Sequence, residues 1–279
     1  MQKPKQWFSE LAWQVAPFQA EAWQAYAEGK SGIVNAPTGS GKTYSLLLPI
    51  LVSHNQTKGL RAIWITPIRA LAKEIFQSAE RAIEGMELDW TVGVRTGDTK
   101  SAERAKQKKQ LPNLLITTPE SLHLLLASKD YPKTFKNLQC VVVDEWHELM
   151  GSKRAVQMEL GLSRLRGMNS ALRTWGISAT IGNMEEALEV LMGLSPFSAE
   201  PREKDRGEVA LTESSDEVSP PVVIRANIKK KIEVKTILPD EVETLPWAGH
   251  LGIKMLKKVL PILDESQTSL IFTNTRSQS

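Results

Sequence analysis

The chain has 279 residues, of which 41% are hydrophobic and 24% are charged, and its formal net charge is +3. This length fits one or two domains with a sizeable core, while so mild a charge does not by itself indicate nucleic-acid binding. No apolar run approaches the roughly 18 residues of a membrane helix, and the polar first residues lack a signal-peptide core, so we expect a cytoplasmic protein without membrane contact.

Short apolar runs alternate with helical patterns over the first two hundred residues. The expected strands cover residues 32–36, 62–66, 91–95, 114–117, 140–144 and 173–178, and the clearest helices cover residues 43–52 and 69–83. Apolar strands separated by helices are typical of a parallel sheet that is covered on both faces. We therefore predict an α/β fold for a first domain of residues 1–196. Cys140, the single cysteine, is expected to be buried in a strand.

The composition changes after residue 196. Residues 197–221 are rich in Pro, Ser, Glu and Asp without periodicity, which indicates a linker or a flexible insertion. We expect a second domain from residue 222 to 279, with a helix at about 250–263 and a strand at 269–273. A helix should follow this strand, but the sequence ends first, so we expect that the second domain is only begun.

Residues 36–43, Ala-Pro-Thr-Gly-Ser-Gly-Lys-Thr, stand between an expected strand and an expected helix. They match the phosphate-binding pattern of NTPases, except that Ala36 replaces the first glycine. Glycines let the backbone N–H groups turn toward phosphates, and the start of the helix adds its positive dipole. Lys42 would contact the β- and γ-phosphates, and the Thr43 hydroxyl would hold Mg²⁺. We thus expect ATP and Mg²⁺ to bind, with nucleotide contacts from Thr38, Gly39, Ser40, Gly41, Lys42 and Thr43.

Asp144-Glu145-Trp146-His147 follows an apolar strand, 102 residues (144 − 42) after Lys42. The carboxylate of Asp144 should lie at the carboxyl edge of the sheet, where open α/β folds bind ligands. Mg²⁺ is commonly held by one or two carboxylates plus substrate phosphates, so Asp144 is a candidate metal ligand together with Thr43. Glu145 is then placed to orient or deprotonate the attacking water.

His147 is a candidate link between the ATP site and Ser178-Ala179-Thr180, which ends the next expected strand. A lone histidine more often has a structural role, and small hydroxyl residues often end strands, so this interpretation depends on the position of the motifs. The candidate catalytic residues are Lys42, Asp144, Glu145 and His147, and the candidate coupling residues are Ser178 and Thr180.

Together these residues resemble superfamily 2 DEXH-box helicases. More narrowly they resemble the large-helicase-related group and its ligase-associated bacterial branch, a resemblance carried by residues 144–149, 175–183 and 246–252. It implies a RecA-like P-loop NTPase domain followed by the start of a second RecA-like domain. It also implies an ATP-dependent helicase or translocase on single-stranded DNA in DNA repair, with repair proteins such as a ligase or nuclease as partners.

The resemblance assigns further residues. Gln19 would recognise adenine, and residues 66–71, 96–98 and 118–122 resemble motifs that contact the backbone of one nucleic-acid strand. The contacts implied are Pro67, Arg69, Thr96, Gly97, Thr118, Pro119 and Glu120. Such groups are chemically suited to phosphates, because Arg69 offers charge and the threonine hydroxyls and helix-start N–H groups offer donors. Without the resemblance, residues 118–120 would be interpreted as an ordinary helix start.

Residues 270–276 resemble the opening motif of the second motor domain. The arginines that reach the γ-phosphate from that domain would come later, so the resemblance implies an incomplete ATP site in the isolated chain. Two alternatives stay open. One is an RNA helicase with the same motor, because backbone contacts hardly distinguish the two sugars. The other is a non-catalytic module that binds a nucleotide or nucleic acid.

Overall fold

The computed structural model describes residues 1–53, 59–149, 152–179, 181–194, 219–228, 234–237, 256–269 and 271–272. The chain divides into two compact units, Met1–Ile228 and Lys229–Ser279. The helix α11 (Leu256–Asp264) belongs to the second unit, and every strand found among the described residues belongs to the first. Among the residues so described, no helix is both long enough and apolar enough to cross a membrane.

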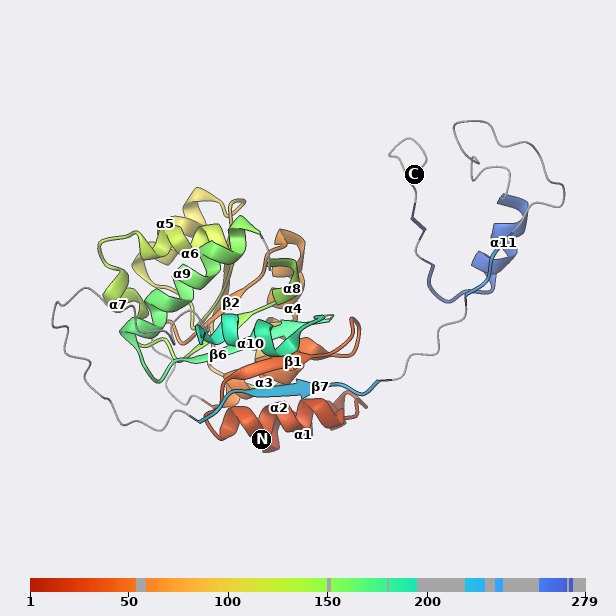
Figure 1. The fold of residues 1–279 in the computed structure, drawn as a ribbon, viewed down its shortest axis with the longest axis horizontal. Helices are drawn as coiled ribbons and strands as arrows, with labels where there is room; N and C mark the ends of the chain where they lie inside the picture. Colours follow the sequence, from red (N-terminus) through yellow and green to blue (C-terminus); the bar gives the residue numbers. More distant parts are fainter. Residues whose placement is uncertain are drawn as a thin grey trace, which may run out of the picture. The chain divides into compact units, whose positions relative to one another are not determined.

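The first unit alternates strands with helices (Figure 1). The strands are β1 (Gly32–Asn35), β2 (Ala62–Ile65), β3 (Val92–Arg95), β4 (Leu114–Thr117), β5 (Cys140–Val143), β6 (Arg173–Ser178) and β7 (Val222–Arg225). The helices are α1 (Gln2–Glu10), α2 (Pro17–Ala27), α3 (Lys42–Val52), α4 (Arg69–Gly85), α5 (Ser101–Lys109), α6 (Pro119–Leu126), α7 (Tyr131–Phe135), α8 (Trp146–Leu149), α9 (Lys153–Met168) and α10 (Met184–Met192).

The strands form one parallel sheet in the order β3-β4-β2-β5-β6-β1-β7. Parallel strands share one carboxyl edge, so the loops that follow them meet on the same side of the sheet. β6 lies between β5 and β1, which places the end of β6 between the acidic motif and the phosphate loop. β3 is an edge strand, and β4 separates it from β2.

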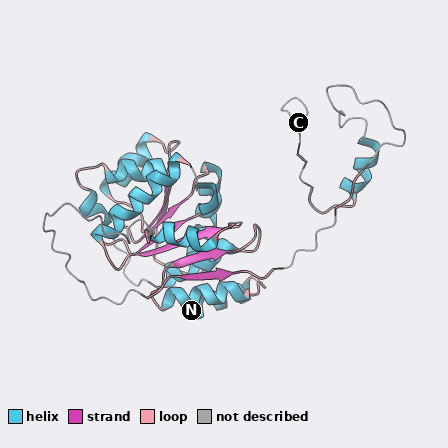
Figure 2. Ribbon diagram, in the orientation of Figure 1, coloured by secondary structure: helices cyan, strands magenta, loops and turns pink. Residues whose placement is uncertain are grey.

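Helices cover both faces of the sheet (Figure 2). Alternate residues of each strand point to opposite faces. Along β5, Cys140 and Val142 join the core under α1 to α4, while Val141 and Val143 join the core under α6 to α10. Because both faces of the central strands β2, β4 and β5 are buried, these strands are almost entirely apolar, which is the pattern that the sequence shows. The predicted α/β fold with a parallel sheet is confirmed.

The first unit extends beyond the predicted domain boundary at residue 196. β7 pairs with β1 along its whole length, and the N–H of Ala226 donates to the carbonyl oxygen of Asn35 at 2.9 Å. A Cβ atom on Gly32 would lie 2.0 Å from the carbonyl oxygen of Val222, so glycine is required where the two strands approach. Residues 222–228 thus lie in the first unit, and not in a second domain as the sequence suggested. The predicted linker lies outside the described residues up to residue 218.

In the second unit, α11 corresponds to the later part of the helix predicted at residues 250–263. The strand predicted at residues 269–273 is absent at Ser269, Ile271 and Phe272, which are the described residues of that range. A strand forms where a neighbour pairs with it and buries one of its faces, but Ile271 is 65% exposed and Phe272 is 86% exposed.

Candidate functional site

The phosphate loop joins β1 to α3 and has a backbone that two glycines make accessible. Gly39 and Gly41 have φ angles of +79° and +80°, in the left-handed region that favours glycine. A Cβ atom on Gly41 would also come within 2.8 Å of the Gln19 amide nitrogen. The Oγ atom of Ser40 is buried and has no hydrogen-bond partner within the described part of the chain. The loop therefore offers a hydroxyl and the start of α3 to an anion.

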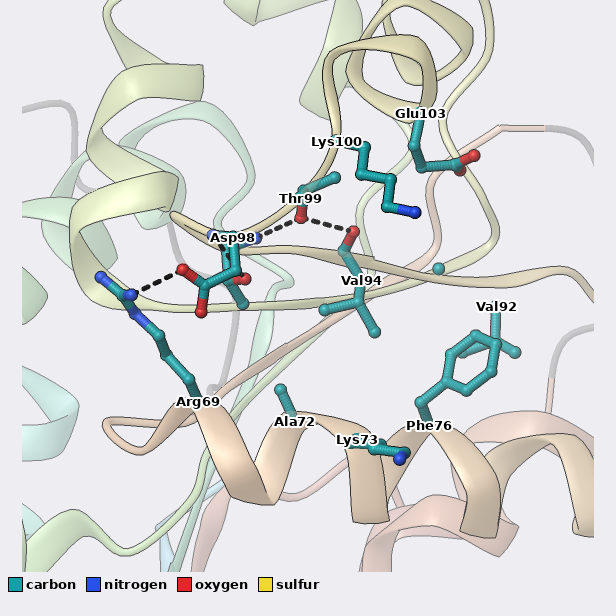
Figure 3. Close-up of a pocket in the computed structure, with 12 residues that line it drawn as sticks. Arg69, Ala72, Lys73, Phe76, Val92, Val94, Asp98, Thr99, Lys100 and Glu103 are labelled. Atoms are coloured by element: carbon teal, nitrogen blue, oxygen red, sulfur yellow. Dashed lines mark hydrogen bonds and ion pairs between the residues drawn. The ribbon is translucent and has the colours of Figure 1, made fainter.

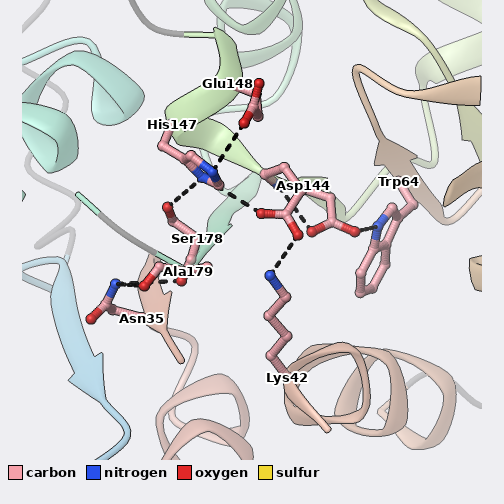
Figure 4. A network of polar contacts seen from close by, with 9 residues as sticks. Asn35, Lys42, Trp64, Asp144, His147, Glu148, Ser178 and Ala179 are labelled. Carbon is pink, nitrogen blue, oxygen red and sulfur yellow. Dashed lines mark hydrogen bonds and ion pairs between the residues drawn. The ribbon is translucent and has the colours of Figure 1, made fainter. Parts of the chain in front are cut away.

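Lys42, the first residue of α3, contacts the acidic motif directly (Figure 4). Its side-chain nitrogen donates to Oε1 of Glu145 at 2.5 Å, although the two residues are far apart in sequence. Both side chains are largely buried, with 10% and 14% exposed for Lys42 and Glu145, respectively. Glu145 has a φ angle of +47°, which is uncommon outside glycine and is a mark of constrained functional sites. In this state the carboxylate of Glu145 therefore neutralises the amine expected to bind phosphate.

Asp144 is held at the end of β5 by two donors. The indole Nε1 of Trp64 donates to its Oδ2 at 3.1 Å, and the backbone N–H of Glu145 donates to its Oδ1 at 2.9 Å. Burial raises the pKa of Asp144 to about 6. The hydrogen bond from Trp64 lowers this pKa in part. The negative charge of Glu145 raises it, and the positive charge of Lys42 lowers it. A bound cation would favour the charged form of this carboxyl group.

Trp64 is a site residue that the sequence analysis did not assign. It lies in β2, which is the direct neighbour of β5 in the sheet, and the indole is fully buried. Its interaction with Asp144 depends on the strand order, which the pattern of apolar residues does not reveal. A tryptophan in a strand beside the acidic motif is the signal that could have suggested it, because a buried indole N–H needs an acceptor.

His147 and Ser178, the candidate link between the ATP site and β6, are in contact. The Oγ of Ser178 lies 2.9 Å from Nδ1 of His147, which is also 3.5 Å from Oε2 of Glu145. The side-chain amide of Asn35, at the end of β1, donates to the carbonyl oxygens of Ser178 and Ala179 at 3.4 and 3.3 Å. These contacts connect the ends of β1 and β6 with the acidic motif. Thr180, the other candidate coupling residue, lies outside the described residues.

Gln19 connects the start of α2 with the phosphate loop. Its side-chain oxygen accepts from the N–H of Ala16 at 2.9 Å, and its side-chain nitrogen donates to the carbonyl oxygen of Gly41 at 3.0 Å. The residue is 4% exposed. An amide has two donors and two acceptor positions, so these contacts leave capacity for a base. The adenine role of Gln19 stays a prediction.

The residues predicted to bind nucleic acid lie beyond the carboxyl ends of three neighbouring strands, β3, β4 and β2. Arg69 begins α4, Thr96 and Gly97 follow β3, and Thr118 precedes α6. A pocket of about 210 Å³ brings these four residues together with Glu120. We call this group of loops the loop cluster. Chain segments that are distant in sequence thus form one surface with threonine hydroxyls, an arginine and a helix start.

An ion pair and side-chain hydrogen bonds to the backbone hold the loop cluster in place. Arg69 Nη1 lies 2.7 Å from Oδ1 of Asp98, in an exposed pair. Arg104 of α5 donates through Nη2 to the carbonyl oxygens of Thr96 and Gly97 at 3.0 and 2.9 Å. A side chain from α5 therefore holds the backbone of residues 96–98 in place.

Arg154 of α9 contacts two of the predicted residues, Glu120 and Pro67. Its Nε atom lies 2.7 Å from Oε1 of Glu120, and its Nη1 donates to the carbonyl oxygen of Pro67 at 3.4 Å. Burial raises the pKa of Glu120, but hydrogen bonds from its backbone, Thr118 and Arg154 together hold the pKa below its usual value. Glu120 therefore keeps its negative charge and orders Arg154, in agreement with its place in the first turn of α6, after Pro119.

Comparison with known protein families identifies the family of the chain. The family model of the DEAD/DEAH box helicases matches residues 16–187, which is more than half of the chain. The chain belongs to the DEAD/DEAH box helicase family. The match covers the phosphate loop, the loop cluster and the acidic motif.

This DEAD/DEAH box helicase chain is similar to proteins of the Lhr group. It is 30% identical to the ATP-dependent helicase Lhr-Core of Methanocaldococcus jannaschii, over 99% of this chain and 32% of that protein. It is 28% identical to the Lhr helicase/uracil glycosylase of Escherichia coli, over 98% of this chain and 18% of that protein. The chain thus spans about a third or less of the length of these relatives.

Solved helicase structures also match this chain. The Mycobacterium smegmatis helicase Lhr, bound to ssDNA and AMP-PNP, matches 99% of this chain and 34% of that chain with a TM-score of 0.78 and 26% identity. The DUF1998 helicase MrfA, bound to DNA, matches 81% of this chain and 30% of that chain with a TM-score of 0.64 and 26% identity. The resemblance to helicases of the large-helicase-related group is confirmed, while the ligase-associated branch and the roles of single residues stay predictions.

Proposed function

We propose that this chain is the ATP-binding part of an ATP-dependent helicase or translocase that moves along single-stranded DNA. The observation that carries the proposal is one sheet edge on which the Lys42–Glu145 pair and Asp144 adjoin the loop cluster. The two solved relatives that are bound to DNA are each 26% identical in sequence to this chain over the part that matches. The Mss116 structures bound to ssRNA are 24% and 21% identical and support the fold alone, so DNA is the favoured track.

The ATP site would work through competition for Lys42. In the free protein Glu145 accepts a hydrogen bond from this amine. A phosphate bound to the loop would take over the amine, because it offers more negative charge and several acceptors. The carboxylate of Glu145 is then free to accept a proton from the attacking water, as a general base does. His147 lies 3.5 Å from Glu145 and 2.9 Å from Ser178, so a shift of the Glu145 carboxylate would change the contacts of His147 and, through Ser178, the end of β6.

Asp144 and Thr43 would hold Mg²⁺ together with the phosphates. The ion would neutralise charge that develops on the phosphates. No cluster of three or more metal-binding side chains exists in the described part of the chain. This fits Mg²⁺, which usually takes one or two carboxylates and keeps waters and substrate phosphates as its other ligands. From the resemblance we extend the proposal to a role in DNA repair, with partners such as a ligase or nuclease.

Binding of ATP and of oligonucleotides to the 279-residue chain tests the proposal first. We expect the chain to bind an ATP analogue with Mg²⁺, and to bind single-stranded DNA at least as tightly as single-stranded RNA of the same sequence. Titration calorimetry and fluorescence anisotropy measure both. Tighter RNA binding would favour an RNA helicase. Binding without DNA-stimulated turnover, in a protein that adds a complete second motor domain, would favour a non-catalytic module.

Replacing Trp64 by phenylalanine is expected to raise the pKa of Asp144 further, because the indole hydrogen bond to its charged form is lost. A hydrogen bond to a charged group is worth about 1.5–3 kcal/mol, which corresponds to about one pH unit or more. Protons compete with the metal for this carboxylate. As the pH is lowered, Mg²⁺-dependent nucleotide binding should therefore be lost at a higher pH in the variant than in the unchanged protein. Titration calorimetry between pH 5 and 8 measures the midpoint.

Trp175→Phe is the matched control. Trp175 is also fully buried in a strand, but its indole nitrogen has no hydrogen-bond partner in the described part of the chain. Both variants leave a similar packing defect, so a general loss of stability would affect them alike. Equal pH midpoints in the two variants would contradict the role of Trp64.

A further inference from the structure

A larger pocket, of about 580 Å³, opens next to the loop cluster between α4 and the edge strand β3 (Figure 3). Its apolar wall consists of Ala72 and Phe76 from α4 and Val92 and Val94 from β3. Phe76 is half-buried and packs against the core, so its ring is held in place but not covered. The apolar surface and the size of the pocket fit a small planar ligand group.

The rim of the pocket is charged, with a positive balance. It carries Arg69, Lys73 and Lys100 against Asp98 and Glu103, which is a net charge of +1 (3 − 2). Asp98 is already paired with Arg69 at 2.7 Å. The surroundings of the apolar wall therefore favour an anionic chain that carries apolar or aromatic groups. A nucleic-acid strand has this composition, with phosphates outside and planar bases that can be placed in the pocket.

The pocket is continuous with the loop cluster. Arg69 and Thr96 line both cavities, so a strand on the phosphate-binding surface passes the mouth of the larger pocket. Addition of a peptide strand to β3 is disfavoured. The carbonyl oxygen of Val94 already accepts from Oγ1 of Thr99 at 3.2 Å and from the side-chain amide of Gln107 at 3.1 Å. An added strand would have to displace these donors.

We propose that this pocket takes one base of the bound single strand, which stacks on the ring of Phe76 while Arg69, Lys73 and Lys100 hold the phosphates on either side. The proposal rests on the proposed function, since it needs a strand on the loop cluster. Stacking on an aromatic ring tolerates any base, as a motor that moves along every sequence requires. The base at this position leaves the stack of its neighbours, so each step along the strand has to free one base and capture the next.

Binding of a fluorescein-labelled thymidine oligonucleotide to variants of the 279-residue chain tests this. Phe76→Ala is expected to weaken binding about tenfold, the usual scale of one lost base–aromatic stack. Phe76→Leu keeps an apolar side chain against the core and should lose nearly as much, whereas Phe76→Trp should restore binding. Leu160→Ala, which removes a 61% exposed apolar side chain from α9, is the control and should bind as the unchanged chain does.

A series of oligonucleotides, each with one abasic site, makes the assignment specific. For the unchanged chain one abasic position should cost about tenfold, and for Phe76→Ala the same position should cost nothing further, because the stack is already lost. A flat series, or unchanged binding by Phe76→Ala and Phe76→Leu, would overturn the base pocket. Arg69→Ala tests the proposed function separately, since it should weaken binding of every oligonucleotide in the series. No oligonucleotide binding by the unchanged chain would overturn both proposals.

Discussion

Replacing Lys42 by alanine is expected to weaken binding of ATP about 100-fold or more. Lys42 is 8% exposed at the start of α3, directly after the left-handed Gly41, so its amine can reach a phosphate in the loop. Truncating one partner of a buried, hydrogen-bonded charge pair typically costs about 2–5 kcal/mol, and every 1.4 kcal/mol is tenfold in affinity. Titration calorimetry with a non-hydrolysable ATP analogue and Mg²⁺ measures the loss.

Lys30→Ala is the control for this loss. Lys30 forms an exposed ion pair with Glu28 at 2.7 Å, and such pairs contribute little. The control should keep its ATP affinity. Unchanged affinity in Lys42→Ala would remove Lys42 from the phosphate site. Lys42→Ala also leaves Glu145 without its buried partner, so thermal unfolding of this variant without nucleotide should occur at a lower temperature than that of Lys30→Ala.

Replacing Glu145 by glutamine is expected to leave ATP bound but to lower turnover by about 10²–10⁴-fold, the usual contribution of a general base. Glutamine has the same shape and keeps an oxygen that can accept from Lys42 Nζ, which now lies 2.5 Å from Oε1 of Glu145. It cannot accept a proton from water at neutral pH. Single-turnover hydrolysis should be measured in a protein that joins this chain to a complete second motor domain.

Glu148→Gln provides the matched control for that measurement. Glu148 lies in the same short helix as His147, and its carboxylate, which is 56% exposed, is 3.4 Å from Nε2 of that histidine. It carries the same charge but does not contact Lys42. We expect it to retain most of its turnover. Near-normal turnover in Glu145→Gln, or an equal loss in both variants, would contradict the assignment of Glu145 as the base.

The strands of the first unit were predictable because burial on both faces leaves a simple pattern. The six strands predicted in the first two hundred residues agree with the structure to within one residue at each end. The strand ends were predictable for the same reason, and the end of the strand at residues 140–144 predicted that Asp144 lies at the carboxyl edge of the sheet. The contact between His147 and Ser178 follows from that edge.

Contacts between distant segments were not predictable in the same way. β7 is as apolar as the other strands, but its partner β1 lies 190 residues (222 − 32) earlier, and nothing local indicates that pairing. The bond from Trp64 to Asp144 depends on β2 and β5 being neighbours, and the pair of Arg69 with Asp98 depends on how the two loops meet. Local pattern sets the face that a residue occupies, whereas the order of the strands sets its neighbours.

The pairing of β7 with β1 determines how the first unit would respond to tension on the chain that follows it. The N–H of Ala226 bonds to the carbonyl oxygen of Asn35, one residue before the phosphate loop begins. A pull on the chain beyond Ile228 that is directed along β7 would load its bonds to β1 together, in shear, and not one after another as in peeling. The strand that carries the phosphate loop is thus the first part of the sheet to bear such a force.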